Sequence, residues 1–546
     1  MKKSIQDSII LLIKEEVEGL LKGRKQPKEI NLDIPADNRF GDLSTNVAMQ
    51  LSKELKAPPQ EIASILAGNL RGRIAKGPLE NHIREVRTAG AGFINFYLSC
   101  DYFYSQLEAL VREKDEALRL SLGEDKKVLV EFVSANPTGP LSVAHARQAA
   151  VGDALANILD FTGFKVGREY YLNDEGNQIN ILGRSIELRL KEMAGETVVF
   201  PDDHYQGEYI YDISRGIKDN NRQVKDFSVY GVEYILKVIR KELSDFGVEF
   251  DCWYSQKSLR ESGKIDEALD FLKKKGFLYE EGGALWFKST DFGDDKDRVV
   301  IKSDGSYTYL APDIAYHRDK YRRGFKKLIN LWGPDHHGYI NRLKAAVAAL
   351  GEDPLSLSVV IVQLATIFRQ GEPVQMSTRR GQYITLREVL DEVGCDAARF
   401  FFLMRRTASH LDFDLDIARK QTAENPVYYV QYAHARIVSI LRQGLAQEKT
   451  GGLDFSLLKE EEEIALLRKM WQFSDILSIC VKTEDPYMIT VYLQELAQSF
   501  HKFYDRHRVL GQEKGLTSAR IALIEGVKII IACGLRLLGV GAPSEM

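Results

Sequence analysis

One stretch, between residues 127 and 172, restricts the possible folds more than any other part of this sequence. It begins with Lys127–Val133, an apolar run rich in β-branched residues that predicts a short buried strand. Five turn-forming residues follow, namely Ser134, Asn136, Pro137, Gly139 and Pro140. From His145 the apolar residues recur near helical spacing as far as Gly163, and Lys165–Leu172 predicts a second buried strand. This order of strand, loop, helix and strand predicts a βαβ unit with two parallel strands.

The loop and helix start of this unit are placed where a ligand could bind. In doubly wound sheets, phosphate groups bind at the carboxyl ends of the strands, beside the N-terminus of a helix. His145 lies at the predicted helix start, so it is a candidate for such a site. A second interpretation has equal weight for this stretch alone: His145 caps the helix, and the prolines only shape a tight loop.

Length and charge limit the class of protein. A chain of 546 residues is too long for one hydrophobic core, so two to four domains are expected. The net charge of -4 excludes a general electrostatic attraction to nucleic acid, so any such binding must come from local basic patches. The densest basic run favours a solvated helix face over an RNA contact. It consists of Arg318, Lys320, Arg322, Arg323, Lys326 and Lys327.

Cysteine spacing and hydropathy indicate the compartment. The 5 cysteines are scattered, without the spacing of a zinc site or a disulfide framework, which indicates a reducing environment. Near the start of the chain, the apolar run Ile9–Ile13 is too short for the core of a signal peptide. No run approaches the roughly 18 apolar residues of a membrane helix. We therefore expect a cytoplasmic protein with no membrane association and no tightly bound metal.

Three domains are predicted. Residues 1–112 form an N-terminal α+β module, and residues 113–385 form a catalytic domain with an insertion at about 183–290. In the catalytic domain strands alternate with helices, which predicts a doubly wound parallel, Rossmann-like sheet. Its later strands are expected at 298–302, 307–310, 327–332 and 358–363. Beyond Leu386 the strand signal disappears, so residues 386–546 are predicted to form a helix bundle.

Three polar segments at or after predicted strands of this sheet are expected to lie near His145. Tyr309 and Asp313 are four residues apart, across the end of a strand and the start of a helix. Gly333–Gly338 contains a histidine pair, and Gln375–Gly381 has hydroxyl and guanidinium donors suited to a polyphosphate. Taken separately, each segment favours a structural interpretation. Tyr309 would be a core aromatic and Asp313 a helix cap. The histidine pair would lie in a surface loop, and the two arginines of Gln375–Gly381 would be solvated charges.

Taken together, the segments resemble those of class I aminoacyl-tRNA synthetases, and their details are similar to the bacterial arginyl-tRNA synthetase family over essentially the whole chain. Glu131–His145 stands where that family has its strand and H-x-G-H loop. Met376–Arg379 stands at its K-M-S-K loop. Further runs similar to the family lie at 304–317, 332–339, 425–436 and 538–546.

The resemblance implies an ATP-dependent ligase. Arginine would be activated to arginyl-adenylate and transferred to the terminal ribose of tRNA(Arg), with release of pyrophosphate and AMP. Its partners would be L-arginine, tRNA(Arg) and ATP, with Mg²⁺ as part of the ATP substrate complex, and the enzyme is expected to be a monomer. The resemblance also implies that the N-terminal module touches the tRNA elbow, and that the helical domain contacts the stem and reads the anticodon.

The resemblance also assigns the site residues. Arginine would be bound by Glu131, Ser134, Asn136, Tyr309, Asp313 and His336. ATP would be bound by Ser142, Ala144, His145, Gln375, Met376, Ser377 and Arg379. Catalysis would involve Ser142, His145, Met376, Ser377, Thr378 and Arg379. The chemistry is consistent with this, because a guanidinium requires acceptors held in a planar, charge-assisted arrangement, which Asp313 would provide. Independently of the resemblance, the aromatic and basic side chains of Tyr428, Tyr432 and Arg436 suit stacking on unpaired bases of tRNA, whereas any one aromatic at helical spacing favours a place in the core.

Three departures from the family pattern concern ATP. Ser142 replaces the first histidine of H-x-G-H, Ala144 replaces its glycine, and Gln375 replaces the first lysine of K-M-S-K. We expect an active enzyme with weaker ATP contacts, for which Arg379 and Arg380 compensate. One alternative is a synthetase-like RNA-binding protein with lost or weakened adenylation. Another is an ATP-dependent ligase or nucleotidyltransferase without tRNA, which the flanking RNA-type modules disfavour.

Overall fold

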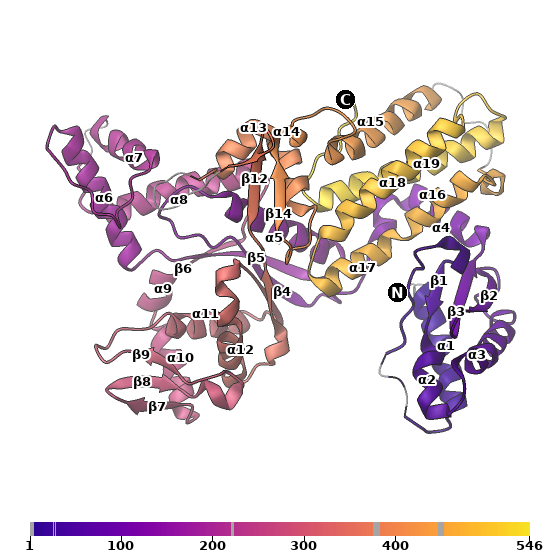
Figure 1. Cartoon of the computed structure of the whole chain (residues 1–546), viewed down its shortest axis with the longest axis horizontal. Helices are drawn as coiled ribbons and strands as arrows, with labels where there is room; N and C mark the ends of the chain where they lie inside the picture. Colours follow the sequence, from indigo (N-terminus) through magenta and orange to yellow (C-terminus); the bar gives the residue numbers. More distant parts are fainter. Residues whose placement is uncertain (1–4, 26, 28, 220–222, 375–382, 446–452) are drawn as a thin grey trace. The chain divides into compact units, whose positions relative to one another are not determined.

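The computed structural model describes residues 5–25, 27, 29–219, 223–374, 383–445 and 453–546. Contacts between residues divide the chain into two compact units (Figure 1). The first unit comprises Met1–Leu118, Arg436–Phe473 and Leu496–Ile530. The second comprises Arg119–Ala435, Ser474–Glu495 and Ile531–Met546.

An antiparallel sheet with three strands lies in the first unit, in the order β1-β3-β2. Its strands are β1 (Leu43–Thr45), β2 (Ile83–Ala89) and β3 (Phe93–Leu98). The accompanying helices are α1 (Ile5–Leu21), α2 (Val47–Leu55), α3 (Pro59–Ile74) and α4 (Cys100–Glu113). Helix α1 buries Ile9, Ile13 and Val17, which recur every four residues and therefore form one apolar face. The predicted α+β character of this region is confirmed.

The central element of the second unit is a parallel sheet with five strands, in the order β11-β10-β4-β5-β6. The strands are β4 (Lys127–Glu131), β5 (Lys165–Leu172), β6 (Cys252–Ser255), β10 (Lys327–Trp332) and β11 (Leu357–Ile361). The chain adds β5 and β6 on one side of β4, and later adds β10 and β11 on the other side. The predicted doubly wound sheet is thus confirmed, and its topological switch point lies between β4 and β10.

Helix α5 (Val143–Phe161) packs closely on β4 and completes the predicted βαβ unit. The close approach depends on Gly152, because a Cβ added there would lie 2.2 Å from Cγ of Phe132. Helices α11 (Leu310–Arg322) and α12 (Ile340–Ala349) also belong to the second compact unit. Leu343 and Val347 of α12 pack with Leu129 of β4. The other helices between β5 and β10 are α6 (Asn177–Met193), α7 (Glu208–Asp219), α8 (Phe227–Asp245), α9 (Gln256–Glu261) and α10 (Lys264–Lys274).

Several strand predictions were wrong in detail. The predicted strand at 298–302 forms β9 (Arg298–Ile301), but it belongs to a separate antiparallel sheet with β7 (Leu278–Glu281) and β8 (Ala284–Phe287). Residues 307–310 form no strand beyond an isolated bridge at Tyr307, because the chain turns into α11 at Leu310. β14 (Leu411–Asp414) lies beyond Leu386 and joins a third sheet with β12 (Ala365–Arg369) and β13 (Glu372–Pro373).

Among the described residues after 385, the secondary structure other than β14 consists of helices, as predicted. The helices are α13 (Leu386–Leu403), α14 (Leu415–Ala418), α15 (Pro426–Leu445), α16 (Glu461–Trp471), α17 (Phe473–Thr483), α18 (Tyr487–Arg506) and α19 (Lys514–Leu537). The glycine pair Gly451 and Gly452, which predicts a break between two helices, lies outside the described residues. Within the described ranges, no helix combines the length and apolar character needed to cross a membrane.

Candidate active site

Glu131 ends β4 at the switch point of the parallel sheet, and its carboxylate is held from two sides. Lys320 Nζ donates to its Oε2 at 2.5 Å, and Ser134 Oγ donates to its Oε1 at 3.2 Å. The turn that brings Ser134 back is strained, because Val133 and Ser134 have φ values of 67° and 41°. Left-handed backbone at a β-branched residue costs about 1–3 kcal/mol and is typical of functional sites. The turn therefore fixes Glu131 and Ser134 as a pair.

Asp313 lies in the first turn of α11 and accepts a hydrogen bond of 2.5 Å from Tyr339 Oη. Burial is the main cause that raises the pKa of Asp313 to about 7; the Tyr339 hydrogen bond opposes this shift, and the nearby Glu131 adds to it. Burial, and then the charges of Asp313 and Glu131, raise the pKa of the Tyr171 hydroxyl. A desolvated acid with this environment favours a cationic ligand.

His145 is in the first turn of α5, where it closes a capping box with Ser142. The Ser142 backbone N–H donates to His145 Nδ1 at 3.2 Å, so the ring proton is on Nε2. Burial lowers the pKa of His145 to about 4, which leaves the ring neutral near pH 7. The interpretation of His145 as a helix cap is confirmed. The same geometry leaves the Nε2 proton as a neutral donor.

The predicted ATP loop lies outside the described residues, which excludes Gln375, Met376, Ser377, Thr378 and Arg379 from structural description. The segment that follows it lies beside the start of α5. Ser142 forms an antiparallel bridge with Thr385, and the Leu386 N–H donates to Leu141 O at 2.8 Å. Tyr383 Oη donates to Pro140 O at 3.1 Å. The described residues that follow the predicted ATP loop in sequence therefore contact the loop that precedes α5.

A buried acid from α8 supports the same loop. Glu242 receives a backbone hydrogen bond from Leu141, and burial raises its pKa to about 7. Its Oε2 has no hydrogen-bond partner among the described residues. Tyr209 of α7 donates from its hydroxyl to Thr138 O at 2.8 Å. Helices α7 and α8, which belong to the region predicted as an insertion, therefore contact the loop between β4 and α5.

Other predicted residues lie in more open positions. Asn136 is exposed, and its Nδ2 donates to Gln178 Oε1 at 2.7 Å. Ala144 is partly exposed in the first turn of α5. Tyr309 is 78% exposed, which makes the core-aromatic interpretation wrong. His336 is exposed beside Trp332, with 5.8 Å between the ring centroids.

The basic run near the end of α11 is not the solvated helix face that the sequence favoured. Lys320 is fully buried in its ion pair with Glu131. The guanidinium of Arg323 donates to both carboxylate oxygens of the buried Glu169, at 2.5 and 2.9 Å. The remaining ion pairs link Arg318 and Arg322 to Glu267, and Lys327 to Glu484. Acidic partners therefore neutralise most of the run, which removes it as an RNA-binding patch.

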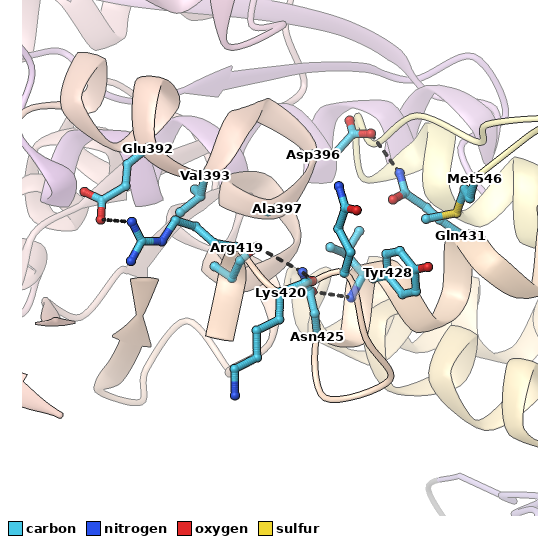
Figure 2. A pocket seen from close by; sticks show the side chains of 13 residues that line it. Glu392, Val393, Asp396, Ala397, Arg419, Lys420, Asn425, Tyr428, Gln431 and Met546 are labelled. Carbon is cyan, nitrogen blue, oxygen red and sulfur yellow. Dashed lines mark hydrogen bonds and ion pairs between the residues drawn. The ribbon is translucent and has the colours of Figure 1, made fainter. Parts of the chain in front are cut away.

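The residues predicted to contact tRNA lie on α15. Tyr428 and Tyr432 are stacked, with ring centroids 6.0 Å apart and planes within 7°. Tyr428 is one of the residues that line a pocket of about 570 Å³, together with Arg419 and Lys420 (Figure 2). In the first unit, the guanidinium of Arg436 lies 5.0 Å from the centroid of the Tyr504 ring.

Sequence reasoning missed three residues of the candidate site, namely Tyr171, Lys320 and Tyr339. Tyr339 ends the histidine-containing run that had been singled out, so its position was a usable signal. Lys320 and Tyr171 gave none, because one resembles a surface lysine and the other an ordinary strand aromatic. Within the described part of the chain, no group of three or more acidic, histidine or cysteine side chains is arranged to bind a metal.

Comparisons with known proteins identify the same family along nearly the whole chain. Three family models match: "Arginyl tRNA synthetase N terminal domain" at residues 7–98, "tRNA synthetases class I (R), catalytic domain" at 106–436, and "DALR anticodon binding domain" at 430–546. The chain is 46% identical to the arginine–tRNA ligase of Geobacillus kaustophilus (strain HTA426), covering 98% of each. It is also 46% identical to that of Syntrophotalea carbinolica, covering 95% of each. The solved structure of Thermus thermophilus arginyl-tRNA synthetase has the same fold, with a TM-score of 0.77, 24% identity and complete coverage of both chains.

Proposed function

Because the chain belongs to the arginyl-tRNA synthetase family and is an arginine–tRNA ligase, we propose which of its residues carry each part of the reaction. The enzyme uses ATP to activate L-arginine as arginyl-adenylate and transfers the arginyl group to tRNA(Arg). Nothing supports the alternative of an RNA-binding protein without adenylation. An aminoacylation assay with tRNA(Arg), L-arginine and ATP tests the activity directly, because only the ligase forms arginyl-tRNA.

We propose that Asp313 binds the guanidinium of arginine. The observation that carries this proposal is a desolvated carboxylate with a raised pKa, whose hydrogen-bond donor is a neutral hydroxyl, that of Tyr339. A guanidinium would supply the missing positive charge and, unlike lysine, would offer parallel N–H donors. Tyr309, exposed at the start of the same helix, would cover the substrate from the solvent side.

The other end of arginine would be bound at the strand end. We propose Glu131 for the α-amino group, with Ser134, Asn136 and His336 around the amino-acid head. The fixed turn after β4 supports the first two roles, since it holds Glu131 and Ser134 together before any substrate binds.

The arginine site is tested with Asp313→Asn. We expect the KM for arginine to rise by about 10²-fold or more, because the buried acceptor loses its charge, with little change in the KM for ATP. Asp319→Asn is the matched control, since Asp319 lies on the same helix but pairs with Lys264. Equal effects of the two substitutions on the arginine KM would contradict the assignment.

For ATP, we propose that the Nε2 proton of His145 and the hydroxyl of Ser142 donate to the nucleotide at the start of α5. The neutral state of His145 supports a hydrogen-bonding role rather than a charged one. The negative charge of the phosphates would then be neutralised by Mg²⁺ bound with ATP and by Arg379. We propose that the other residues of the same loop also contact ATP, namely Gln375, Met376, Ser377 and Thr378. The bridge between Ser142 and Thr385 supports this, because it holds a residue that follows that loop in sequence beside the helix start. Ala144 would face the adenosine.

For tRNA, we propose that Tyr428 and Tyr432 stack on unpaired bases of the anticodon loop and that Arg436 contributes positive charge. Their helix overlaps the matched anticodon-binding region, which supports the proposal. We further propose three functional domains: 1–112 contacts the tRNA elbow, 113–385 carries the chemistry, and 386–546 contacts the stem and anticodon. Since every residue named for the reaction comes from one chain, we propose a monomer that acts in the cytoplasm, where tRNA is charged.

A further inference from the structure

Arg147 of α5 is a buried cation that joins two separate connections of the chain through their backbone carbonyls. Its Nη1 donates to Gln363 O at 2.8 Å and to Leu364 O at 3.4 Å. The same nitrogen donates to Ser409 O at 2.9 Å, and Nη2 donates to Arg406 O at 3.1 Å. Among the described residues, the hydrogen-bond acceptors of this guanidinium are therefore all backbone oxygens.

This charge is costly to bury. Arg147 is 0% exposed, and its Nε has no hydrogen-bond partner within the described ranges. Burial lowers its pKa to about 10, and the charge of Asp485 opposes this shift, so the guanidinium stays charged near pH 7. Well-packed apolar side chains generally stabilise a core at least as well as buried charges do. The residue therefore indicates a requirement for fixed geometry rather than for stability alone.

The first connection that Arg147 holds lies at the ligand edge of the parallel sheet. Gln363 and Leu364 lead from the carboxyl end of β11 to the start of β12. The second connection, residues 404–410, leads from α13 to β14, which pairs in parallel with β12. Thr407 in this connection accepts from the Gln363 N–H at 2.9 Å, and its own N–H donates to Asp485 Oδ2 at 3.0 Å. Arg147 thus ties α5 to the point where β11 ends and the β12–β14 pair begins.

The same part of α5 carries the proposed nucleotide contact. His145 precedes Arg147 by two residues on the helix, so the two side chains move together with α5. On the other side, β12 leads into β13, which ends shortly before the predicted ATP loop in sequence. A displaced connection between β11 and β12 would therefore change the position of the sheet edge relative to His145.

We propose that Arg147 is a positioning residue for ATP, whose guanidinium fixes the connection between β11 and β12 relative to the start of α5. This inference rests on the proposed ATP site, in which His145 and Ser142 donate to the nucleotide. Arginine suits this role because its planar fork donates to carbonyls of two segments at once, whereas the ammonium of lysine is a single point charge.

The test compares Arg147→Lys with Arg399→Lys in the full-length enzyme with tRNA(Arg). Arg399 is the matched control, because it is equally buried and donates to the backbone oxygens of Leu538 and Phe246. Both substitutions should lower the denaturation midpoint. For Arg147→Lys we expect the KM for ATP to rise by about tenfold or more, as for a misplaced binding group, with the KM for arginine within about twofold. For Arg399→Lys both KM values should stay within about twofold of the wild type.

The split between the two KM values separates positioning from a purely structural role. An unchanged KM for ATP in Arg147→Lys, an equal rise in its KM for arginine, or an equal rise in the KM for ATP of Arg399→Lys would overturn the inference. If Arg147→Lys does not fold, Asp485→Asn decides the matter, since it removes the charge that holds Thr407 and stabilises the guanidinium. Its KM for ATP should rise by about threefold or more, and an unchanged value would overturn the inference.

Failure of this inference is distinguishable from failure of the ATP site itself. His145→Ala is measured in the same series. If that substitution leaves both kcat and the KM for ATP unchanged, the proposed ATP site is wrong. If it changes either value while Arg147→Lys leaves the KM for ATP unchanged, the site stands and only the positioning role is refuted.

Discussion

The affinity of the free enzyme for arginine should depend on pH through Asp313. Its pKa in the empty site is about 7, raised mainly by burial from an ordinary value of 3.8. Only the ionised carboxylate pairs with a guanidinium, and such a pair typically lowers a carboxyl pKa by 1–3. Binding therefore releases a proton wherever the free enzyme is protonated, so affinity must fall as the pH falls below about 7.

The size of the effect follows from the same value. The apparent Kd is multiplied by about 1 + 10^(pKa − pH), which is about 11 at pH 6 and about 1.1 at pH 8. We expect arginine to bind about tenfold more weakly at pH 6 than at pH 8, or by about 1.4 kcal/mol. About 0.9 proton should be released per arginine at pH 6, and about 0.1 at pH 8.

Stability of the empty enzyme should change in the opposite sense. The folded state binds the Asp313 proton more tightly than the unfolded state does, so this group stabilises the fold at low pH. That contribution is lost as the pH rises from about 4 to about 7. Saturating arginine should offset the loss, because the ionised acid then has its cation.

Isothermal titration calorimetry in buffers of different ionisation enthalpy measures both the Kd and the proton count. Asp313→Asn should bind weakly and without pH dependence in this range. Glu242→Gln is the control for the second acid with a pKa of about 7, and it should retain the wild-type pH dependence because Glu242 contacts Leu141 rather than the arginine site. Equal affinities at pH 6 and pH 8, or uptake of protons on binding, would refute the reasoning.

Three further outcomes are expected. Tyr339→Phe removes the hydroxyl that donates to Asp313, so the KM for arginine should rise by about 5- to 30-fold, equivalent to about 1–2 kcal/mol. An unchanged KM would show that this hydrogen bond does not contribute to arginine binding. Gly152→Ala forces a methyl group against Phe132, so it should lower the free energy of unfolding by about 1–3 kcal/mol in denaturant titrations. An unaltered denaturation midpoint would show that α5 moves away from Phe132 without cost. The double substitution Arg379→Ala and Arg380→Ala should lower the charging rate through weaker ATP contacts, and wild-type rates would remove the idea that these arginines compensate for the altered signature positions.

The candidate site was predictable wherever a residue type and its position on an element carried the signal. Asp313 could be proposed because an acid at a helix start after a strand faces the ligand edge of a parallel sheet, whereas Glu131 was proposed from the family resemblance. His145 had two interpretations that the sequence could not separate, and the structure supports the capping one directly. Tyr309 was assigned to a strand end, but the helix begins at once after it and leaves its ring 78% exposed.

Local pattern by itself determined the βαβ unit, the parallel sheet and the helical character of the C-terminal region, because the period of buried side chains is written into adjacent residues. Tertiary structure alone decided the role of Lys320. In sequence it is one charge in a basic run, which favours a solvated face. In the fold, two neighbouring strands bring Glu131 and Asn330 side by side, and only there does burying an ammonium become favourable. A buried charge depends on partners from distant segments, and no local pattern encodes their meeting.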